Sequence, residues 1–228
     1  MGEIIEFPSN GTSGQGYLAV PESGSGPGVV VIQEWWGLVD HIKDVCDRFA
    51  AEGFTALAPD LYRGEATTEP DEAGKLMMAL NIEQAAKDMS GAVDEVARRS
   101  TGNGGRVGVI GFCMGGGLAL MLGAHRGDKV GAVAPFYGLI PWPGAQPDYT
   151  KMTAAVQGHY AEKDDYFNPE AVAGLDEELT AAGVEHELFS YPGADHAFFN
   201  DARPEVYDAG ASSQAWGRVL DFLRDQLG

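Results

Sequence analysis

The sequence predicts an α/β fold, in which a doubly wound, mainly parallel sheet starts with an antiparallel N-terminal hairpin and carries helices on both faces. Short apolar runs rich in β-branched residues alternate with helical patterns from residue 29 onward. The segments between these runs are long enough for right-handed βαβ crossovers. Before residue 21, two short strand patterns are joined by a turn-rich segment, which is typical of a hairpin.

Local pattern also predicts where each element lies. Apolar, β-branched runs bounded by turn residues indicate strands. In chain order, we expect strands at 3–7, 16–20, 29–32, 54–58, 107–110, 130–136, 153–157 and 184–191. Apolar residues at helical spacing predict helices between Gly37 and Gly53 and at 71–80, 82–99, 118–122, 170–182 and 205–227.

Composition and charge limit the function classes. The chain has 228 residues, of which 44% are hydrophobic, and a formal net charge of −19. This length fits a single domain, 1–228, and the negative charge argues against nucleic acid or an anionic membrane as a partner. The N-terminus lacks a signal-peptide pattern, and no apolar stretch approaches the length of a membrane span. We therefore expect a cytoplasmic protein.

The segment 107–122 carries the strongest functional motif. A buried strand pattern leads into Gly111-x-Cys113-x-Gly115, and a helical pattern follows. This is the glycine frame of a nucleophile elbow, with cysteine where serine is usual. The elbow needs glycines because side chains on either side of the nucleophile would collide with neighbouring strands. The thiol would stand at a helix N-terminus, where free N–H groups and the helix dipole favour the thiolate. Alternatively, the glycines form an ordinary turn and Cys113 is a small core residue, as we expect Cys46 to be.

A cysteine nucleophile needs a base, and that base needs an acceptor that orients it. His196 follows the last predicted strand, which places it at the sheet edge where the chemistry of such folds gathers. His159 also follows a predicted strand, and Asp164 and Asp165 lie a few residues further on. The remaining histidines fall within helical or strand patterns: His41, His125 and His186.

A second motif, Gln33-Glu34-Trp35-Trp36, follows the predicted strand at 29–32 and places a carboxylate next to two tryptophans. A carboxylate beside two bulky indoles would be partly desolvated, and therefore able to accept a proton from a nearby thiol. The simpler interpretation is that Glu34 caps the helix that follows.

With these motifs, the chain resembles the dienelactone hydrolase family (carboxymethylenebutenolidases) of the α/β-hydrolase superfamily. The resemblance covers nearly the whole chain and rests on the segments 33–37, 58–62, 108–116, 159–164 and 195–199. The order nucleophile, acid, histidine is also that of α/β-hydrolases. The resemblance implies the α/β-hydrolase fold. It further implies a triad of Cys113, His196 and Asp164, with Asp165 as the less favoured acid.

The resemblance also implies a role for Glu34, whose carboxylate in such enzymes meets the resting thiol and shifts when substrate binds. The implied chemistry is acyl transfer, in which the Cys113 thiolate attacks the carbonyl of a lactone or activated ester. The backbone N–H groups of Trp35 and Met114 would hold the oxyanion, and water activated by His196 would hydrolyse the thioester. We expect no cofactor or metal, a small-molecule lactone or ester as the binding partner, and a monomer or small homo-oligomer.

The resemblance is weaker among the residues that would bind the substrate. Well-known dienelactone hydrolases hold the substrate carboxylate with two arginines, one before the elbow and one shortly after the catalytic histidine. This chain has Asn200 at the second position and no arginine between residues 64 and 97. The candidate replacements are Arg63, Lys75 and Arg203.

The expected substrate contacts are Trp36, Tyr137 and Arg203, although core packing would explain the two aromatic residues equally well. Two other functions stay open on the sequence. One is a binding domain that has kept the fold without catalysis. The other is a redox sensor that uses the Cys113 thiol, although neither cysteine has a neighbouring cysteine in sequence that could resolve an oxidised form.

Overall fold

One sheet of eight strands runs through residues 2–101 and 103–228, the part of the chain that the structure, a computed structural model, describes. The strands are β1 (Glu3–Ser9), β2 (Thr12–Ala19), β3 (Gly28–Ile32), β4 (Thr55–Pro59), β5 (Val107–Phe112), β6 (Val130–Phe136), β7 (Ala155–Lys163) and β8 (His186–Asp195). Their order is β1-β2-β4-β3-β5-β6-β7-β8. β2 pairs antiparallel with β1 and β4, and every other pair is parallel. The predicted fold class is therefore confirmed.

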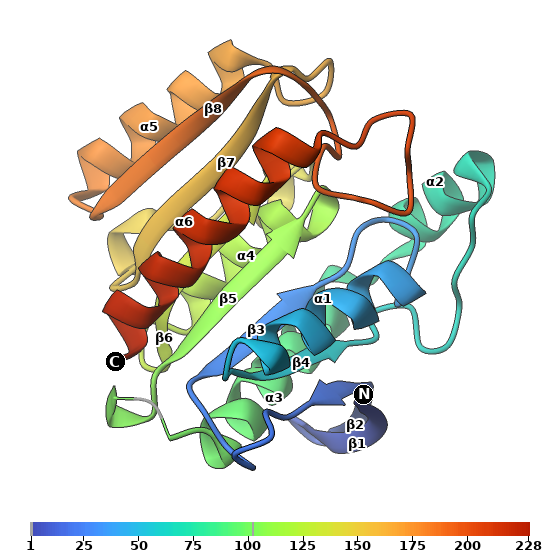
Figure 1. The fold of residues 1–228 in the computed structure, drawn as a ribbon, viewed down its shortest axis with the longest axis vertical. Coiled ribbons are helices and arrows are strands. Elements are labelled where there is room, and N and C mark those ends of the chain that lie inside the picture. Colours follow the sequence, from blue (N-terminus) through green and yellow to red (C-terminus); the bar gives the residue numbers. More distant parts are fainter. Residues whose placement is uncertain (1, 102) are drawn as a thin grey trace.

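Helices cover both faces of this sheet (Figure 1). They are α1 (Asp40–Ala51), α2 (Pro70–Ala79), α3 (Ile82–Arg99), α4 (Met114–His125), α5 (Pro169–Ala182) and α6 (Ala209–Leu227). Short 3₁₀ turns lie at Asn103–Gly105, Pro143–Ala145 and Tyr149–Lys151. On one face, Phe49 of α1 and Leu223 of α6 belong to the same buried apolar cluster. On the other face, Val93, Leu118 and Leu179 join α3, α4 and α5 in a second cluster.

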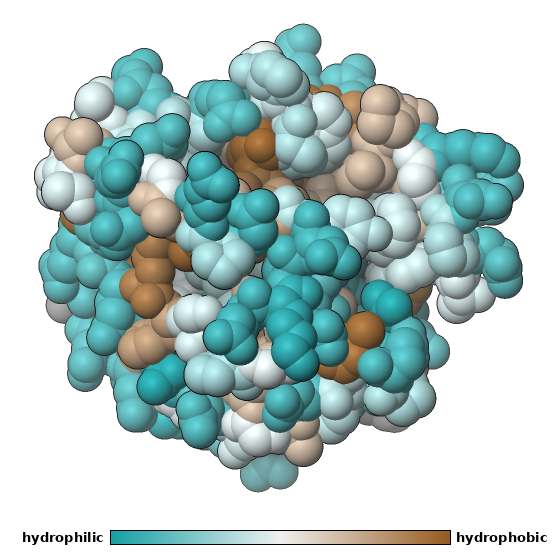
Figure 2. All heavy atoms as spheres, turned by 90° about the horizontal axis from the view of Figure 1, so that it is seen from above, coloured by the Kyte–Doolittle hydropathy of each residue, from teal (hydrophilic) through white to brown (hydrophobic). Residues whose placement is uncertain are grey.

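The face of the molecule in Figure 2 is mainly hydrophilic, and its apolar residues appear as separate patches among polar ones. This agrees with the formal net charge of −19. The large hydrophobic residues that are exposed in the described part of the chain are Ile4, Val20, Met78, Tyr166 and Tyr207. In the same part of the chain, no helix has both the length and the apolar composition of a membrane span.

The N-terminal turn is tighter than the sequence pattern indicated. β1 and β2 extend until only Asn10 and Gly11 separate them. The φ angles of these two residues, 40° and 98°, lie in the left-handed region. An Asn-Gly pair adopts this geometry readily, and the twist of such a two-residue turn matches that of the flanking strands.

β7 departs most from the predicted strands, because it runs to Lys163 instead of ending at 157. His159 therefore lies inside the strand, and the expectation that it follows a strand was wrong. Its ring is fully buried, stacks on Phe136 with 4.4 Å between ring centroids, and bonds through Nδ1 to the Tyr191 hydroxyl at 2.8 Å. Burial lowers the pKa of His159 to about 3, so it is a neutral core residue. A polar residue inside a buried strand concealed the strand's true length.

The segment before α6 also differs from the prediction of a helix from 205. The helix begins at Ala209, because the Asp208 carboxylate accepts a hydrogen bond from the Ala211 N–H at 2.9 Å and caps it. β8 in turn extends to Asp195, so that His196 follows it directly. Residues 196–208 thus form the connection from β8 to α6 at the edge of the sheet.

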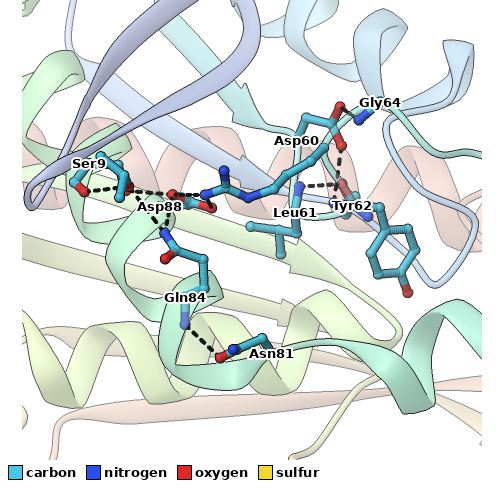
Figure 3. Close-up of polar contacts among 11 residues, drawn as sticks. Ser9, Asp60, Leu61, Tyr62, Gly64, Asn81, Gln84 and Asp88 are labelled. Atoms are coloured by element: carbon cyan, nitrogen blue, oxygen red, sulfur yellow. Dashed lines mark hydrogen bonds and ion pairs between the residues drawn. The ribbon is translucent and has the colours of Figure 1, made fainter.

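Asp88 of α3 ties the N-terminal hairpin to the rest of the fold (Figure 3). Its carboxylate is 2% exposed and accepts hydrogen bonds from the Ser9 hydroxyl and from Gln84 Nε2 at 3.0 Å. Arg63, which follows β4, pairs with the same carboxylate at 2.9 Å. The Arg63 guanidinium therefore has a structural role, and Arg63 is not among the residues that line the cavity described below.

Replacing Asp88 with alanine should lower the free energy of unfolding by about 1–3 kcal/mol, because the buried Ser9 hydroxyl loses its acceptor. Chemical denaturation would measure this change. The matched control is Lys87→Ala on the same helix, which removes only a surface pair with Glu83 and should cost about 0–1 kcal/mol. Equal losses in the two variants would contradict the account.

Candidate active site

Cys113 lies at a sharp turn between β5 and α4. Its backbone has φ 55° and ψ −121°, a region that residues with side chains rarely adopt. A Cβ on Gly111 would collide with the carbonyl oxygen of Gly115, and a Cβ on Gly115 would collide with that of Gln33. The glycine frame read from the sequence is therefore a steric requirement of this turn.

The turn places the half-buried Cys113 side chain at the N-terminus of α4. The Cys113 N–H donates to the carbonyl of Phe136 at 3.0 Å, which fixes the turn against β6. The positive end of the dipole of α4 therefore lies near the thiol.

Asp164 and His196 meet at the neighbouring strand ends, since one follows β7 and the other follows β8. His196 Nδ1 lies 2.7 Å from Asp164 Oδ2. The other carboxylate oxygen accepts from the N–H groups of Tyr166 and Phe167 at 2.8 and 2.9 Å. The Asp164 side chain is fully buried, whereas Asp165 is exposed. The structure thus pairs His196 with Asp164 and not with Asp165.

Charge and hydrogen bonding shift the pKa values of both His196 and Asp164. Burial alone would lower the pKa of His196, but hydrogen bonds with Asp164 and Cys113 and the charges of both raise it to about 10. Burial alone would raise the pKa of Asp164, but the hydrogen bond and charge of His196 lower it. At neutral pH, the pair is therefore an imidazolium beside a carboxylate.

Glu34 lies beneath the same region and is 1% exposed. Its carboxylate accepts hydrogen bonds from Asn200 Nδ2 at 2.7 Å and from the Tyr137 hydroxyl at 3.4 Å. Asn200 is held in this orientation because its Oδ1 accepts from the N–H of Ala202 at 3.1 Å. Glu34 and Cys113 line the same cavity, and within the described residues no hydrogen bond joins them.

The Glu34 carboxylate is buried, and the neighbouring indoles of Trp35 and Trp36 pack edge to face on each other with 4.9 Å between ring centroids. The alternative interpretation, that Glu34 caps α1, was wrong, because the N-cap residue is Val39 and its position has no side-chain cap. The sequence offered no signal for the hydrogen bond from Asn200 to Glu34, because the two residues lie far apart along the chain.

Cys113, His196 and Glu34 line one cavity of about 580 Å³. Trp35, Trp36, Met114 and Arg203 also line it, as do residues that the sequence analysis did not single out: Pro70, Met77, Pro141, Lys163, Tyr166, Phe167, Asp195, Ala197, Glu205 and Val206. Asp165 lines it as well. This volume is within the range of small-molecule sites.

Tyr137 and Lys75 are not among the residues of the cavity wall. Tyr137 is fully buried, and its ring lies edge-on to His196 with 5.3 Å between centroids. It was expected to touch substrate, but it instead supports Glu34 and His196 from below. Lys75 pairs with Glu72 on the exposed side of α2 at 2.6 Å.

The sequence analysis assigned the backbone N–H groups of Trp35 and Met114 to an oxyanion hole. Both residues line the cavity. The Met114 N–H is at the first position of α4, where no intrahelical acceptor exists. The Trp35 N–H has no backbone or side-chain acceptor among the described residues. In residues 2–101 and 103–228, no group of His, Cys, Asp and Glu side chains is arranged to hold a metal ion.

The pairing of His196 with Asp164 predicts a distinct titration. Removing the carboxylate in Asp164→Asn should lower the pKa of His196 from about 10 toward its ordinary value near 6.5, because a hydrogen bond and a negative charge are lost. The imidazolium would then lose its proton at lower pH than in the wild type. NMR titration of the imidazole would measure this, with Asp165→Asn as the matched control. A larger fall in Asp165→Asn than in Asp164→Asn would contradict the assignment.

Comparison with known proteins identifies the family. The model of the dienelactone hydrolase family matches residues 15–227. The chain is 37% identical to Protein usf of Aquifex pyrophilus and 35% identical to a protein of Aquifex aeolicus provisionally named a carboxymethylenebutenolidase, covering 100% of both chains in each case. A crystal structure from Klebsiella pneumoniae, provisionally named a dienelactone hydrolase, has a TM-score of 0.87 at 29% identity and covers 98% of each chain. The chain therefore belongs to the dienelactone hydrolase family.

Proposed function

We propose that this protein is a cysteine-dependent hydrolase of lactones or activated esters, with Cys113 as nucleophile, His196 as acid and base, and Asp164 as the orienting acid. The observation that carries the proposal is one cavity in which a thiol at an elbow turn meets a histidine paired with a buried carboxylate. Family membership supports a hydrolase that acts on lactones or esters.

The first half of the proposed reaction forms a thioester. The Cys113 thiolate attacks the carbonyl carbon, and the N–H groups of Trp35 and Met114 bind the oxyanion that develops. The oxyanion collapses and breaks the bond to the leaving oxygen. His196, charged at neutral pH, donates its proton to that oxygen. Asp164 holds the imidazole through Nδ1, which leaves Nε2 to make this transfer.

The second half returns the enzyme to its starting state. Neutral His196 takes a proton from water as the water oxygen attacks the thioester carbonyl. Collapse of the second oxyanion releases the carboxylic acid and restores the thiolate beside an imidazolium. A thiolate leaves more readily than an amide nitrogen, so strained lactones and activated esters suit this site better than peptides do.

Glu34 has a separate role in this proposal. Its buried carboxylate lines the same cavity as the thiol, and its hydrogen-bond donors in the described part of the chain are neutral, Asn200 and Tyr137. It is therefore a proton acceptor available to Cys113 when the thiol is neutral. The redox alternative has less support, because Cys46, the other cysteine of the chain, is a free thiol that is fully buried in α1.

Replacing Cys113 or His196 with alanine should lower kcat/KM for p-nitrophenyl acetate by about a thousandfold or more, because each removes a group that acts in the transition state. Release of p-nitrophenol measures the rate, and circular dichroism checks the fold. Cys46→Ala is the matched control, since it removes the other free thiol, which lies in the core. Turnover near the wild-type rate in either active-site variant would reject the proposal.

A further inference from the structure

We propose that Glu205 acts as an internal counter-ion for Arg203, so that the cavity selects acyl groups without a charge. This inference rests on the proposed function, because it concerns which esters or lactones the site accepts. Both residues lie in the connection from β8 to α6, and both line the cavity that contains Cys113.

The guanidinium of Arg203 is held from two sides. Its Nε donates to Glu205 Oε1 at 2.9 Å, and its central carbon lies 5.6 Å from the ring centre of Trp36. A hydrogen bond from its own backbone N–H, together with Arg203, lowers the pKa of Glu205, which is therefore ionised at neutral pH. The Arg203 guanidinium thus already has a carboxylate partner.

The backbone of this connection fixes the pair. The N–H of Arg203 donates to the carbonyl of Asn200 at 3.0 Å, and the N–H groups of Val206 and Tyr207 both donate to the carbonyl of Arg203 at 3.1 Å. The turn holds the backbones of Arg203 and Glu205 two residues apart, and their side chains, 32% and 59% exposed, pair across it.

The rest of the cavity wall offers a substrate carboxylate little else. Lys163 and the imidazolium of His196 are the other cations of the wall. Lys163 lies opposite Asp195 in the pairing of β7 with β8, and His196 is already paired with Asp164. Asp165 and Glu34 add further negative charge. A negatively charged acyl group would be repelled by these carboxylates, which disfavours its binding.

Apolar groups complete the wall. Met77, Val206 and Phe167 line the cavity together with the indole of Trp36. Such side chains favour an alkyl or aromatic acyl chain through the burial of apolar surface. Charge and packing therefore point to the same class of substrate, a neutral ester or lactone.

Two esters of similar shape and different charge test this inference, p-nitrophenyl butyrate and the mono-p-nitrophenyl ester of succinate. Wild-type kcat/KM should favour the butyrate by about tenfold or more, after correction for their rates with free cysteine. Glu205→Gln should raise the ratio of succinate to butyrate kcat/KM by about tenfold, because Arg203 becomes free to pair with the substrate. Asp165→Asn removes one charge from the same wall without releasing Arg203, and should change the ratio by about twofold at most.

The double variant Glu205→Gln/Arg203→Gln should return the ratio toward that of the wild type, since the released guanidinium is gone. Wild-type preference for the succinate ester, or a ratio that shifts no more in Glu205→Gln than in Asp165→Asn, would overturn the inference. In either case, hydrolysis of the butyrate that depends on Cys113 would leave the proposed function standing.

A second measurement does not depend on hydrolysis. N-ethylmaleimide and 3-maleimidopropionate both add to the Cys113 thiolate, with the new S–C bond replacing the C=C π bond and a proton taken up from water. Cys113→Ser gives the background. Glu205→Gln should raise the relative rate of the charged reagent several-fold more than Asp165→Asn does. This result without ester turnover would sink the proposed function and retain the charge selection. Equal effects of the two variants would overturn the inference.

Discussion

The backbone conformation of Cys113 is the constraint on which the cavity depends. Holding this residue at φ 55° and ψ −121° costs roughly 1–3 kcal/mol. The burial of every residue of β5 and its packing beside β6 offset this cost. A Cβ on Gly138 would collide with the Cys113 carbonyl, so the chain that follows β6 must also pass without a side chain. Through this contact, the turn sets the position of Tyr137 and, beyond it, of Glu34.

The parallel strands explain why such distant residues meet. Their carboxyl ends share one edge of the sheet. The adjacent strands β3, β5, β6, β7 and β8 each contribute a group where they end. Glu34 comes after β3, Cys113 after β5, Tyr137 after β6, Asp164 after β7 and His196 after β8. Since the hydrogen bonds between strands use backbone groups, the side chains at the strand ends can change while the sheet is kept. The connection after β8 shows this, because Arg203 and Glu205 shape the cavity wall without touching the elbow.

The sequence predicted most of the fold, because buried strands and amphipathic helices have strong local patterns. β6 and α3 have the bounds that were expected. Local pattern failed where tertiary burial overrides it, as at His159, whose ring is hidden between aromatic residues. It also could not tell which side of an aromatic residue faces the cavity, so Tyr137 was misplaced. The bond from Asn200 to Glu34 joins residues 166 positions apart, and no local spacing reports such a contact.

The central claim is that an acyl group resides on the sulfur of Cys113 during turnover. Acid quenching of the wild type while it hydrolyses p-nitrophenyl acetate, followed by peptide mass mapping, tests this claim directly. We predict an acetyl group on the peptide that contains Cys113, absent from the peptide that contains Cys46, which disappears once the ester is consumed. An acetyl group on another residue, or an unmodified Cys113 in every sample taken during steady turnover, would contradict the account.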